Sequence, residues 1–218
     1  KLIAIIGLLL WNGQNFAHSI NCNKDLYKNQ NLSFETRAKD LISKMTLDEK
    51  ISQMVNDAAA IERLGIQEYN WWNECLHGLA RAGKATVFPQ SIGLGATFDP
   101  DLVYRMADAI SDEARAFYRY ASKRGNRGLY TGLNFYSPNV NIYRDPRWGR
   151  GQETYGEDPF LTSQLGVAFV KGLQGNDNKY LKTAACAKHF AVHSGPEKYR
   201  HEFNAITNFR DLHETYLP

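Results

Sequence analysis

Residues 133–190 read LNFYSPNVNIYRDPRWGRGQETYGEDPFLTSQLGVAFVKGLQGNDNKYLKTAACAKHF, and this stretch decides the fold. It begins with a strand-like segment at 133–142, and the small, apolar segment at 183–190 indicates a buried strand. Between them, Asp158 and Pro159 open a helix, with the aspartate as cap and the proline in the first turn. A strand, a helix and a second strand at this spacing predict a parallel crossover.

The same Asp-Pro pair occurs at residues 99–100 and predicts a helix that runs to about Ser122. One side of this helix is apolar, through Val103, Met106, Ala107, Ile110, Ala114 and Phe117. Before it, residues 86–88 (Thr-Val-Phe) indicate a short strand that ends at Pro89. The pattern therefore alternates between short apolar segments and helices.

Two helices are expected between residue 34 and about residue 55. Apolar residues recur at helical spacing over 34–45, and the sequence Thr-Leu-Asp-Glu at 46–49 is a capping box that opens a second helix through about Val55. Residues 20–32 are polar and rich in Asn, which is typical of a linker. A last helix is expected over 208–217.

This alternation predicts an α/β fold, and the Gly- and Arg-rich segments follow the strands, where a β/α barrel builds its active site. A doubly wound sheet is the alternative, but no G-x-G-x-x-G follows any strand. A complete barrel needs about 250 residues. The 218 residues include leading helices, so we expect an incomplete (β/α)8 TIM-type barrel preceded by short helices.

The first 19 residues have the pattern of a secretory signal peptide. A basic Lys1 precedes the apolar run 2–10, and Ala-His-Ser at 17–19 offers small residues at the spacing of a signal-peptidase site. The apolar run is too short for a helix that spans a bilayer. We therefore expect a secreted or periplasmic protein. The alternative is that the apolar run 2–10 is a buried strand or helix of the folded protein.

Composition excludes several classes of protein. Apolar residues make up 43% and charged residues 22%, which is ordinary for a globular protein. The net charge is +3 and the basic residues are scattered, so neither a nucleic-acid nor a membrane partner is indicated. Three cysteines without C-x-x-C spacing speak against a disulfide framework or structural zinc. One disulfide plus one free thiol, or three free thiols, remain open.

Three polar segments could carry chemistry. The loop 141–159 holds three arginines, whose planar donors can bridge vicinal hydroxyls or can brace the loop against acidic neighbours. Lys188 and His189 end the second strand and could reach a ligand or simply be solvated there. The segment 71–74 (Trp-Trp-Asn-Glu) offers rings and a carboxylate for a sugar, or two core tryptophans beside a capping Asn.

A metal hydrolase is a further class to weigh. His189 and His193 have the spacing of a zinc-protease helix, but the glutamate of H-E-x-x-H is missing and Ser-Gly-Pro at 194–196 breaks any helix. No G-x-S-x-G elbow and no Walker loop occurs either. The sequence therefore favours neither a metal site nor a serine or nucleotide hydrolase.

Taken together, the segments resemble glycoside hydrolase family 3. The motifs are W-W-N-E-C-L-H-G, N-x-Y-R-D-P-R-W-G-R-G-Q-E-T-Y-G-E-D-P, A-K-H-F and G-P-E-x-x-R-H-x-F-N-A, in this order over 33–218. The last one looks most like bacterial β-xylosidases and related β-glucosidases. The resemblance implies an N-terminal β/α barrel, usually a second α/β domain, and removal of β-D-xylosyl or β-D-glucosyl residues with retention, in plant polysaccharide breakdown.

The resemblance also implies which residues touch the substrate. Sugar-binding positions fall on Glu74, Arg144, Lys188 and His189, whereas Arg147, Arg150, Arg200 and His201 are expected to brace loops. The family's nucleophile lies in an S-D-W or S-D-C segment beyond A-K-H-F, which this sequence does not contain. We therefore assign no catalytic residue, and we expect an oligosaccharide substrate, no cofactor, a missing C-terminal α/β domain as partner and no activity of the fragment alone. An inactive sugar-binding protein is the alternative.

Overall fold

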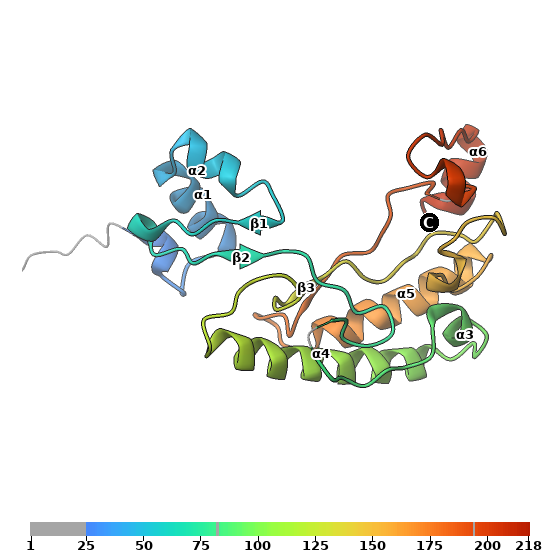
Figure 1. The fold of residues 1–218 in the computed structure, drawn as a ribbon, viewed down its shortest axis with the longest axis horizontal. Coiled ribbons are helices and arrows are strands. Elements are labelled where there is room, and N and C mark those ends of the chain that lie inside the picture. Colours follow the sequence, from blue (N-terminus) through green and yellow to red (C-terminus); the bar gives the residue numbers. More distant parts are fainter. Residues whose placement is uncertain (1–24, 82, 194) are drawn as a thin grey trace, which may run out of the picture. The chain divides into compact units, whose positions relative to one another are not determined.

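The computed structural model describes residues 25–81, 83–193 and 195–218 and divides into two compact units, residues 1–50 and 51–218 (Figure 1). The predicted signal peptide, residues 1–19, lies outside the described residues. Among those residues, no helix is long and apolar enough to cross a membrane.

In the first unit, the two N-terminal helices begin where the sequence predicts. Helix α1 spans Phe34–Lys44 and α2 spans Leu47–Ser52. The capping box is confirmed, because Thr46 N donates to Glu49 Oε2 at 2.8 Å and Glu49 N donates to Thr46 Oγ1 at 3.2 Å. Helix α2 ends at Ser52, earlier than expected.

The described end of the segment 20–32 is tied to α1. Residues Leu26–Lys28 form a short 3-10 helix whose Tyr27 is buried. The Tyr27 amide donates to Asp40 Oδ2 at 3.0 Å, and Arg37 Nε donates to the Tyr27 carbonyl at 2.8 Å. Side chains of α1 thus satisfy the backbone of this turn.

The second unit begins with an antiparallel pair that the sequence did not predict, β1 (Asp57–Ala58) with β2 (Tyr69–Asn70), joined through a 3-10 turn at Glu62–Leu64. The prediction of a strand at 86–88 is wrong. Thr86 N and Oγ1 donate to the Glu113 carboxylate instead, and Phe88 N donates to the His77 carbonyl at 2.8 Å. Helix α3 (Ser91–Gly95) follows this irregular segment.

Two long helices form the main packing interface. Helix α4 spans Pro100–Ser122 and α5 spans Pro159–Gln174. Both predicted caps are confirmed: Asp99 Oδ1 accepts from Leu102 N at 2.9 Å, and Asp158 Oδ1 accepts from Leu161 N at 2.6 Å. Their apolar sides meet in a core of fully buried side chains: Val103, Ile110, Phe135, Leu165, Phe169 and Leu173.

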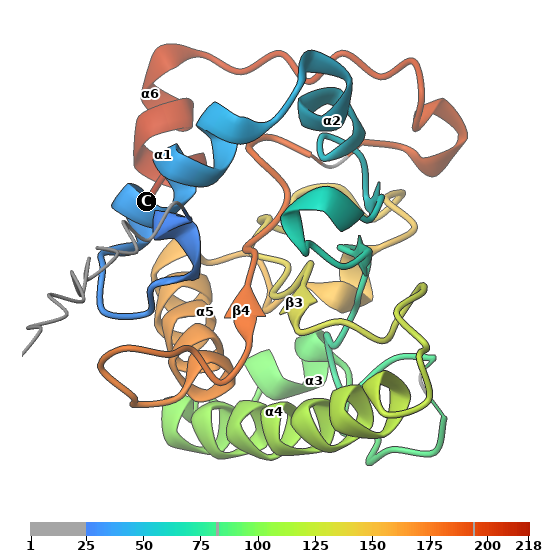
Figure 2. The same cartoon turned by 90° about the vertical axis from the view of Figure 1, so that its left-hand side faces the viewer.

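Strand β3 (Asn134–Phe135) precedes α5 in the sequence and strand β4 (Ala184–Ala185) follows it. The two strands pair directly and in parallel, which confirms the predicted crossover. Figure 2 shows the two strands side by side, with α4 and α5 beside them. Both strands are shorter than predicted, but pairing resumes where Lys188 N donates to Pro138 O at 2.9 Å and Val140 N donates to Lys188 O at 2.8 Å. This continuation fixes the place of Lys188.

Short turns complete the chain. A 3-10 helix spans Gly151–Glu153 and another spans Glu197–Tyr199. In place of one helix over 208–217, a short α6 (Phe209–Asp211) continues into a π-helix at Leu212–Tyr216. Of the cysteines, the described Cys75 and Cys186 are free thiols, and Cys22 lies outside the described residues.

Candidate functional site

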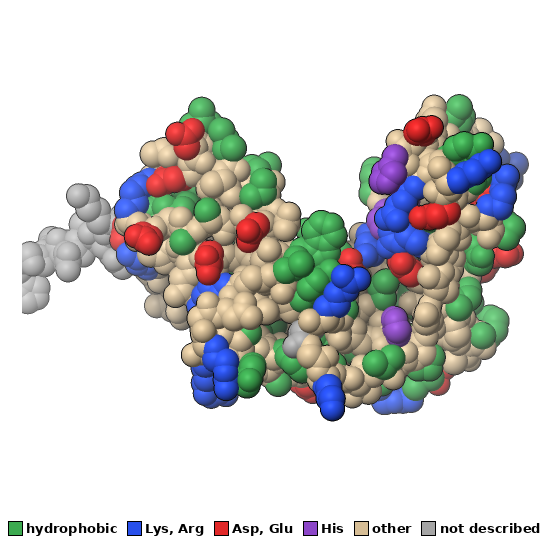
Figure 3. All heavy atoms as spheres, in the orientation of Figure 1, with side chains coloured by type: hydrophobic (Ala, Val, Ile, Leu, Met, Phe, Trp, Pro, Cys, Tyr) green, Lys and Arg blue, Asp and Glu red, His purple; other side chains and the backbone are tan. Residues whose placement is uncertain are grey.

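A pocket of about 560 Å³ lies in the second unit, where four segments of the chain meet. The first segment follows β2, the second contributes Tyr130 before β3, the third contains the 3-10 turn Gly151–Glu153, and the fourth follows β4. Its charged lining residues are Glu74, Arg81, Arg150, Glu153 and Lys188. Figure 3 shows Lys, Arg and His side chains gathered on the part of this unit beside α6.

Glu74 and Lys188 form an ion pair in this pocket. Lys188 Nζ lies 2.9 Å from Glu74 Oε1 and 3.0 Å from Oε2, and the lysine side chain is only 12% exposed. Burial raises the pKa of Glu74, although Lys188 opposes this shift. The structure thus brings together two residues that the sequence assigned to sugar binding.

Arg150 lies beside this pair and is held by Glu153. Arg150 Nε donates to Glu153 Oε1 at 2.8 Å, a second bond joins Nη2 and Oε2, and Asn139 Nδ2 also donates to Oε2 at 3.3 Å. Burial acts to raise the pKa of Glu153, but the paired arginine outweighs it and the pKa is lowered. Arg150 and Glu153 therefore form a bidentate ion pair with fixed geometry.

His189 fixes the other side of the Arg150 guanidinium. Arg150 Nη1 lies 3.0 Å from His189 Nε2, and His189 Nδ1 lies 2.8 Å from Asn141 Oδ1. The Asn141 amide nitrogen donates to the carbonyls of His189 and Ala191, so its oxygen is the acceptor. His189 Nδ1 therefore carries the proton, and Nε2 accepts from the arginine.

The His189 ring is consequently neutral at physiological pH. Burial, and then the positive charges of Arg150, His193 and Lys188, lower its pKa to about 3. Both ring nitrogens are used within the protein, so the ring positions Arg150. The expectation from the family resemblance that His189 contacts a sugar stays a prediction.

Arg144 does not join the others. Its Nη2 donates to the Val192 carbonyl at 3.4 Å, its guanidinium lies 5.3 Å from the Tyr216 ring centroid, and it does not line the pocket. Arg150, expected only to brace its loop, lines the pocket instead. Glu153 lies three residues after Arg150, and this spacing was the sequence signal that could have predicted an ion pair that orients the Arg150 guanidinium.

Arg147 does brace the loop. Its Nε and Nη2 donate to the two Asp145 carboxylate oxygens at 3.0 and 2.8 Å, and its side chain is exposed. The hydrogen bonds from Arg147 lower the pKa of Asp145 to about 2. A similar local pair joins Arg200 and Glu197 at 3.3 Å, and Glu197 Oε2 also accepts from Gly149 N at 3.3 Å.

The tryptophans of W-W-N-E are not core residues. Trp71 is 46% and Trp72 is 45% exposed, and Trp72 lines the pocket with its ring edge-on to Tyr136. Asn73 is buried instead, donating to the Asn70 carbonyl at 3.2 Å and accepting from Gly132 N at 2.8 Å. A half-exposed indole at a pocket rim suits stacking on a ring.

A metal site has no ligand set in the described part of the chain, where no three His, Cys, Asp or Glu side chains are grouped to hold an ion. The centroids of the His189 and His193 rings lie 4.4 Å apart, with the ring planes tilted by 48°. The chemistry of the pocket suits binding of a polar ligand, because its lining offers two carboxylates, several cationic donors and an aromatic face.

Comparison with known proteins places the chain in a family. Residues 28–217 match the model of the glycosyl hydrolase family 3 N-terminal domain. A xylan 1,4-beta-xylosidase from Xylanibacter ruminicola is 52% identical over 196 residues, which cover 88% of this chain and 23% of that protein. The chain thus spans about a quarter of the length of this relative.

Solved structures agree. A family 3 exo-beta-xylosidase in complex with a xylobiose aziridine probe has a TM-score of 0.69 at 37% identity, covering 79% of this chain and 23% of that one. A beta-glucosidase from Listeria innocua has a TM-score of 0.61 at 28% identity, covering 86% and 30%. The chain therefore belongs to glycosyl hydrolase family 3, with the TIM-barrel-like α/β fold of the family's N-terminal domain.

Proposed function

We propose that the pocket holds the terminal sugar of a β-linked oligosaccharide. On this proposal the protein is a retaining β-glycosidase that removes β-D-xylosyl or, as second choice, β-D-glucosyl residues from non-reducing ends during the breakdown of plant polysaccharides. The observation that carries the proposal is the Glu74–Lys188 ion pair beside the fixed guanidinium of Arg150 in one pocket.

The donor and acceptor set suits a sugar. A carboxylate such as that of Glu74 can accept from two vicinal hydroxyls, and Lys188 and Arg150 can donate to ring and hydroxyl oxygens. The exposed ring of Trp72 offers an apolar face for the flat side of a pyranose. Ion pairs within the protein already orient these groups. Binding of a sugar therefore costs little side-chain conformational entropy.

Cleavage needs more than this set. A retaining glycosidase uses two carboxyls about 5–5.5 Å apart, one as nucleophile and one as acid/base, and no cofactor. Both carboxylates that line the pocket are paired with cations, Glu74 with Lys188 and Glu153 with Arg150. We therefore propose that they bind substrate and that the reacting carboxylates come from elsewhere in the polypeptide, a C-terminal α/β domain included.

A sugar-binding protein without catalysis is the second candidate, since paired carboxylates also suit a site that only binds. Two measurements on the purified 218-residue chain test the sugar-binding site that both candidates share. Titration calorimetry should show binding of xylobiose that Glu74→Gln and Lys188→Met weaken at least tenfold. Hydrolysis of an aryl β-xyloside should be undetectable; robust turnover without added metal would contradict the division between binding and cleavage.

The domain limits belong to the same proposal: a signal peptide at 1–19, a linker at 20–32, and at 33–218 part of a β/α barrel that begins with short helices. The family match covers residues 28–217, which includes nearly the whole of the last segment and also the end of the proposed linker. Residues 1–19 would direct the protein to the periplasm or the medium. Expression in a bacterium, envelope fractionation and sequencing of the mature N-terminus test this; a cytoplasmic product that retains residues 1–19 would contradict it.

A further inference from the structure

Arg81 and Tyr130 face each other at the pocket. The Arg81 guanidinium carbon lies 5.5 Å from the centroid of the Tyr130 ring, and both residues line the pocket. Both also have a left-handed backbone, with φ of 60° and 64°. Bulky residues rarely adopt this conformation, which costs on the order of a kcal/mol or more and clusters where ligands are held.

Among the residues that the structure describes, three cationic side chains and two carboxylates line the pocket, and Arg81 is the cation that neither carboxylate pairs with. Glu74 is paired with Lys188, and Glu153 is paired with Arg150. In the described residues, Arg81 has no carboxylate within ion-pair distance, and it is exposed. The pocket therefore carries one uncompensated positive charge, and this charge can approach a ligand without breaking an existing ion pair.

The cationic and aromatic lining continues beyond Tyr130. This residue also lines a neighbouring hollow of about 110 Å³, together with Phe117, Tyr120 and Arg124. There the Arg124 guanidinium lies 3.7 Å from the centroid of the Tyr120 ring. A chain that leaves the pocket past Tyr130 thus meets a second arginine stacked on a tyrosine.

We propose that Arg81, held against Tyr130, binds the carboxylate of a uronic-acid substituent on an oligosaccharide whose end occupies the pocket. This inference rests on the proposed sugar-binding function and specifies the class of substrate. The guanidinium can donate two parallel hydrogen bonds to a carboxylate, and the tyrosine ring restricts its orientation beforehand. The Arg124–Tyr120 pair then favours acidic chains further along the same path.

The test compares three ligands by titration calorimetry at low salt: xylotriose, xylotriose with one glucuronic acid substituent, and free glucuronate. The wild-type chain should bind the glucuronic-acid-substituted xylotriose about fivefold to tenfold more tightly than neutral xylotriose, as expected for a charge-assisted hydrogen bond. Free glucuronate should bind more weakly than either, because it cannot fill the pocket. High salt should shrink the preference.

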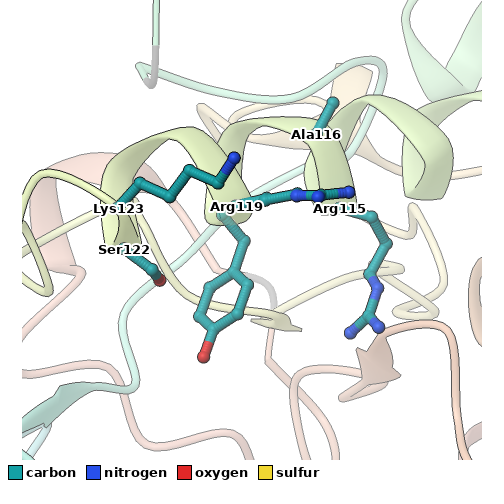
Figure 4. Close-up of a pocket in the computed structure, with 6 residues that line it drawn as sticks. Arg115, Ala116, Arg119, Ser122 and Lys123 are labelled. Atoms are coloured by element: carbon teal, nitrogen blue, oxygen red, sulfur yellow. The ribbon is translucent and has the colours of Figure 1, made fainter.

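Arg81→Asn is the informative variant, because Asn tolerates a left-handed backbone and lacks the cation. This variant should bind neutral and substituted xylotriose equally. Arg115→Gln is the matched control: it removes the same charge from an exposed arginine on α4, where Figure 4 shows it in a separate hollow with Arg119 and Lys123. This variant should keep the preference for the acidic ligand.

The outcomes are separable. Equal binding of neutral and substituted xylotriose by the wild-type chain, or an unchanged preference in Arg81→Asn, overturns the uronate site and leaves the sugar pocket intact. An equal loss in Arg115→Gln overturns it too, because the preference would then come from the overall field of the protein. No binding of neutral xylotriose by the wild-type chain contradicts the proposed function instead.

Discussion

Arg150 Nη1 lies 3.0 Å from His189 Nε2, although 39 residues separate the two in the sequence. The histidine can accept this bond only as the neutral Nδ1-protonated tautomer, which Asn141 fixes from the other side. With Glu153 on its remaining edge, the guanidinium has a single orientation. His189 therefore acts through Arg150, and Arg150 is the residue that faces the pocket.

This relationship separates the two arginines of the R-D-P-R-W-G-R motif that could bind a sugar. Arg150→Met should weaken xylobiose binding at least tenfold, since it removes charge-assisted donors from the pocket. Arg144→Met should leave the dissociation constant within about twofold, because Arg144 contacts Val192 and Tyr216 outside the pocket. Calorimetry on both variants checks this; the reverse order of effects would restore Arg144 as the sugar contact.

The low pKa of His189 makes stability depend on pH. Its folded-state pKa of about 3 lies below the unfolded value of about 6.5, so between these values the unfolded chain binds a proton that the folded chain does not. The free energy of unfolding should therefore fall as the pH is lowered from 7 to 5. The urea midpoint at each pH measures it.

His189→Gln should flatten this pH dependence, because Gln can still accept from Arg150 but does not titrate. The exposed His201 supplies the control: His201→Gln should keep the wild-type slope. If His189→Gln and wild type lose equal stability between pH 7 and 5, the histidine is not held neutral in the folded chain.

The Glu74–Lys188 pair can be tested by a double-mutant cycle. Each single change, Glu74→Gln or Lys188→Met, leaves a half-buried charge without its partner and should lower the free energy of unfolding by roughly 1–3 kcal/mol. The double variant should be less destabilised than the sum, with a coupling of about 1 kcal/mol. Urea denaturation of the four proteins measures this. Additive effects would mean that the two groups do not interact.

Features that depend on near neighbours in the sequence were predictable. The caps at Asp99 and Asp158 and the capping box at Thr46 use residues three positions apart, so their sequence pattern contains the whole interaction. The parallel crossover followed from the order and spacing of its elements. The Glu74–Lys188 association followed from the family motifs, since no local pattern joins residues 114 positions apart.

Features decided by distant contacts were missed. Residues 86–88 have strand-forming composition, but the Glu113 carboxylate and the His77 carbonyl take the hydrogen bonds that a sheet partner would need. Arg144 and Arg150 share a loop and a residue type, and the contact of Arg150 with His189, which comes from another segment, has no counterpart in the local sequence. Residue type gave the chemistry of the site, whereas its geometry depended on which side chains other segments already held in place.

The packing of α4 on α5 depends on a glycine. A Cβ at Gly172 would overlap the carbonyl oxygen of Tyr104 and would lie 2.9 Å from Ala107 Cβ, so the helices would have to move apart. Gly172→Ala should lower the free energy of unfolding by about 1–3 kcal/mol, seen as a lower urea midpoint. Gly93→Ala in α3 is the control, because the nearest atom to the new Cβ, Pro89 Cβ, would lie 3.8 Å away. Alanine reduces the backbone freedom of the unfolded chain, so this variant should be more stable than the wild type by about 0.5–1 kcal/mol. Equal midpoints for the two variants would show that the close approach of α4 and α5 does not restrict this position.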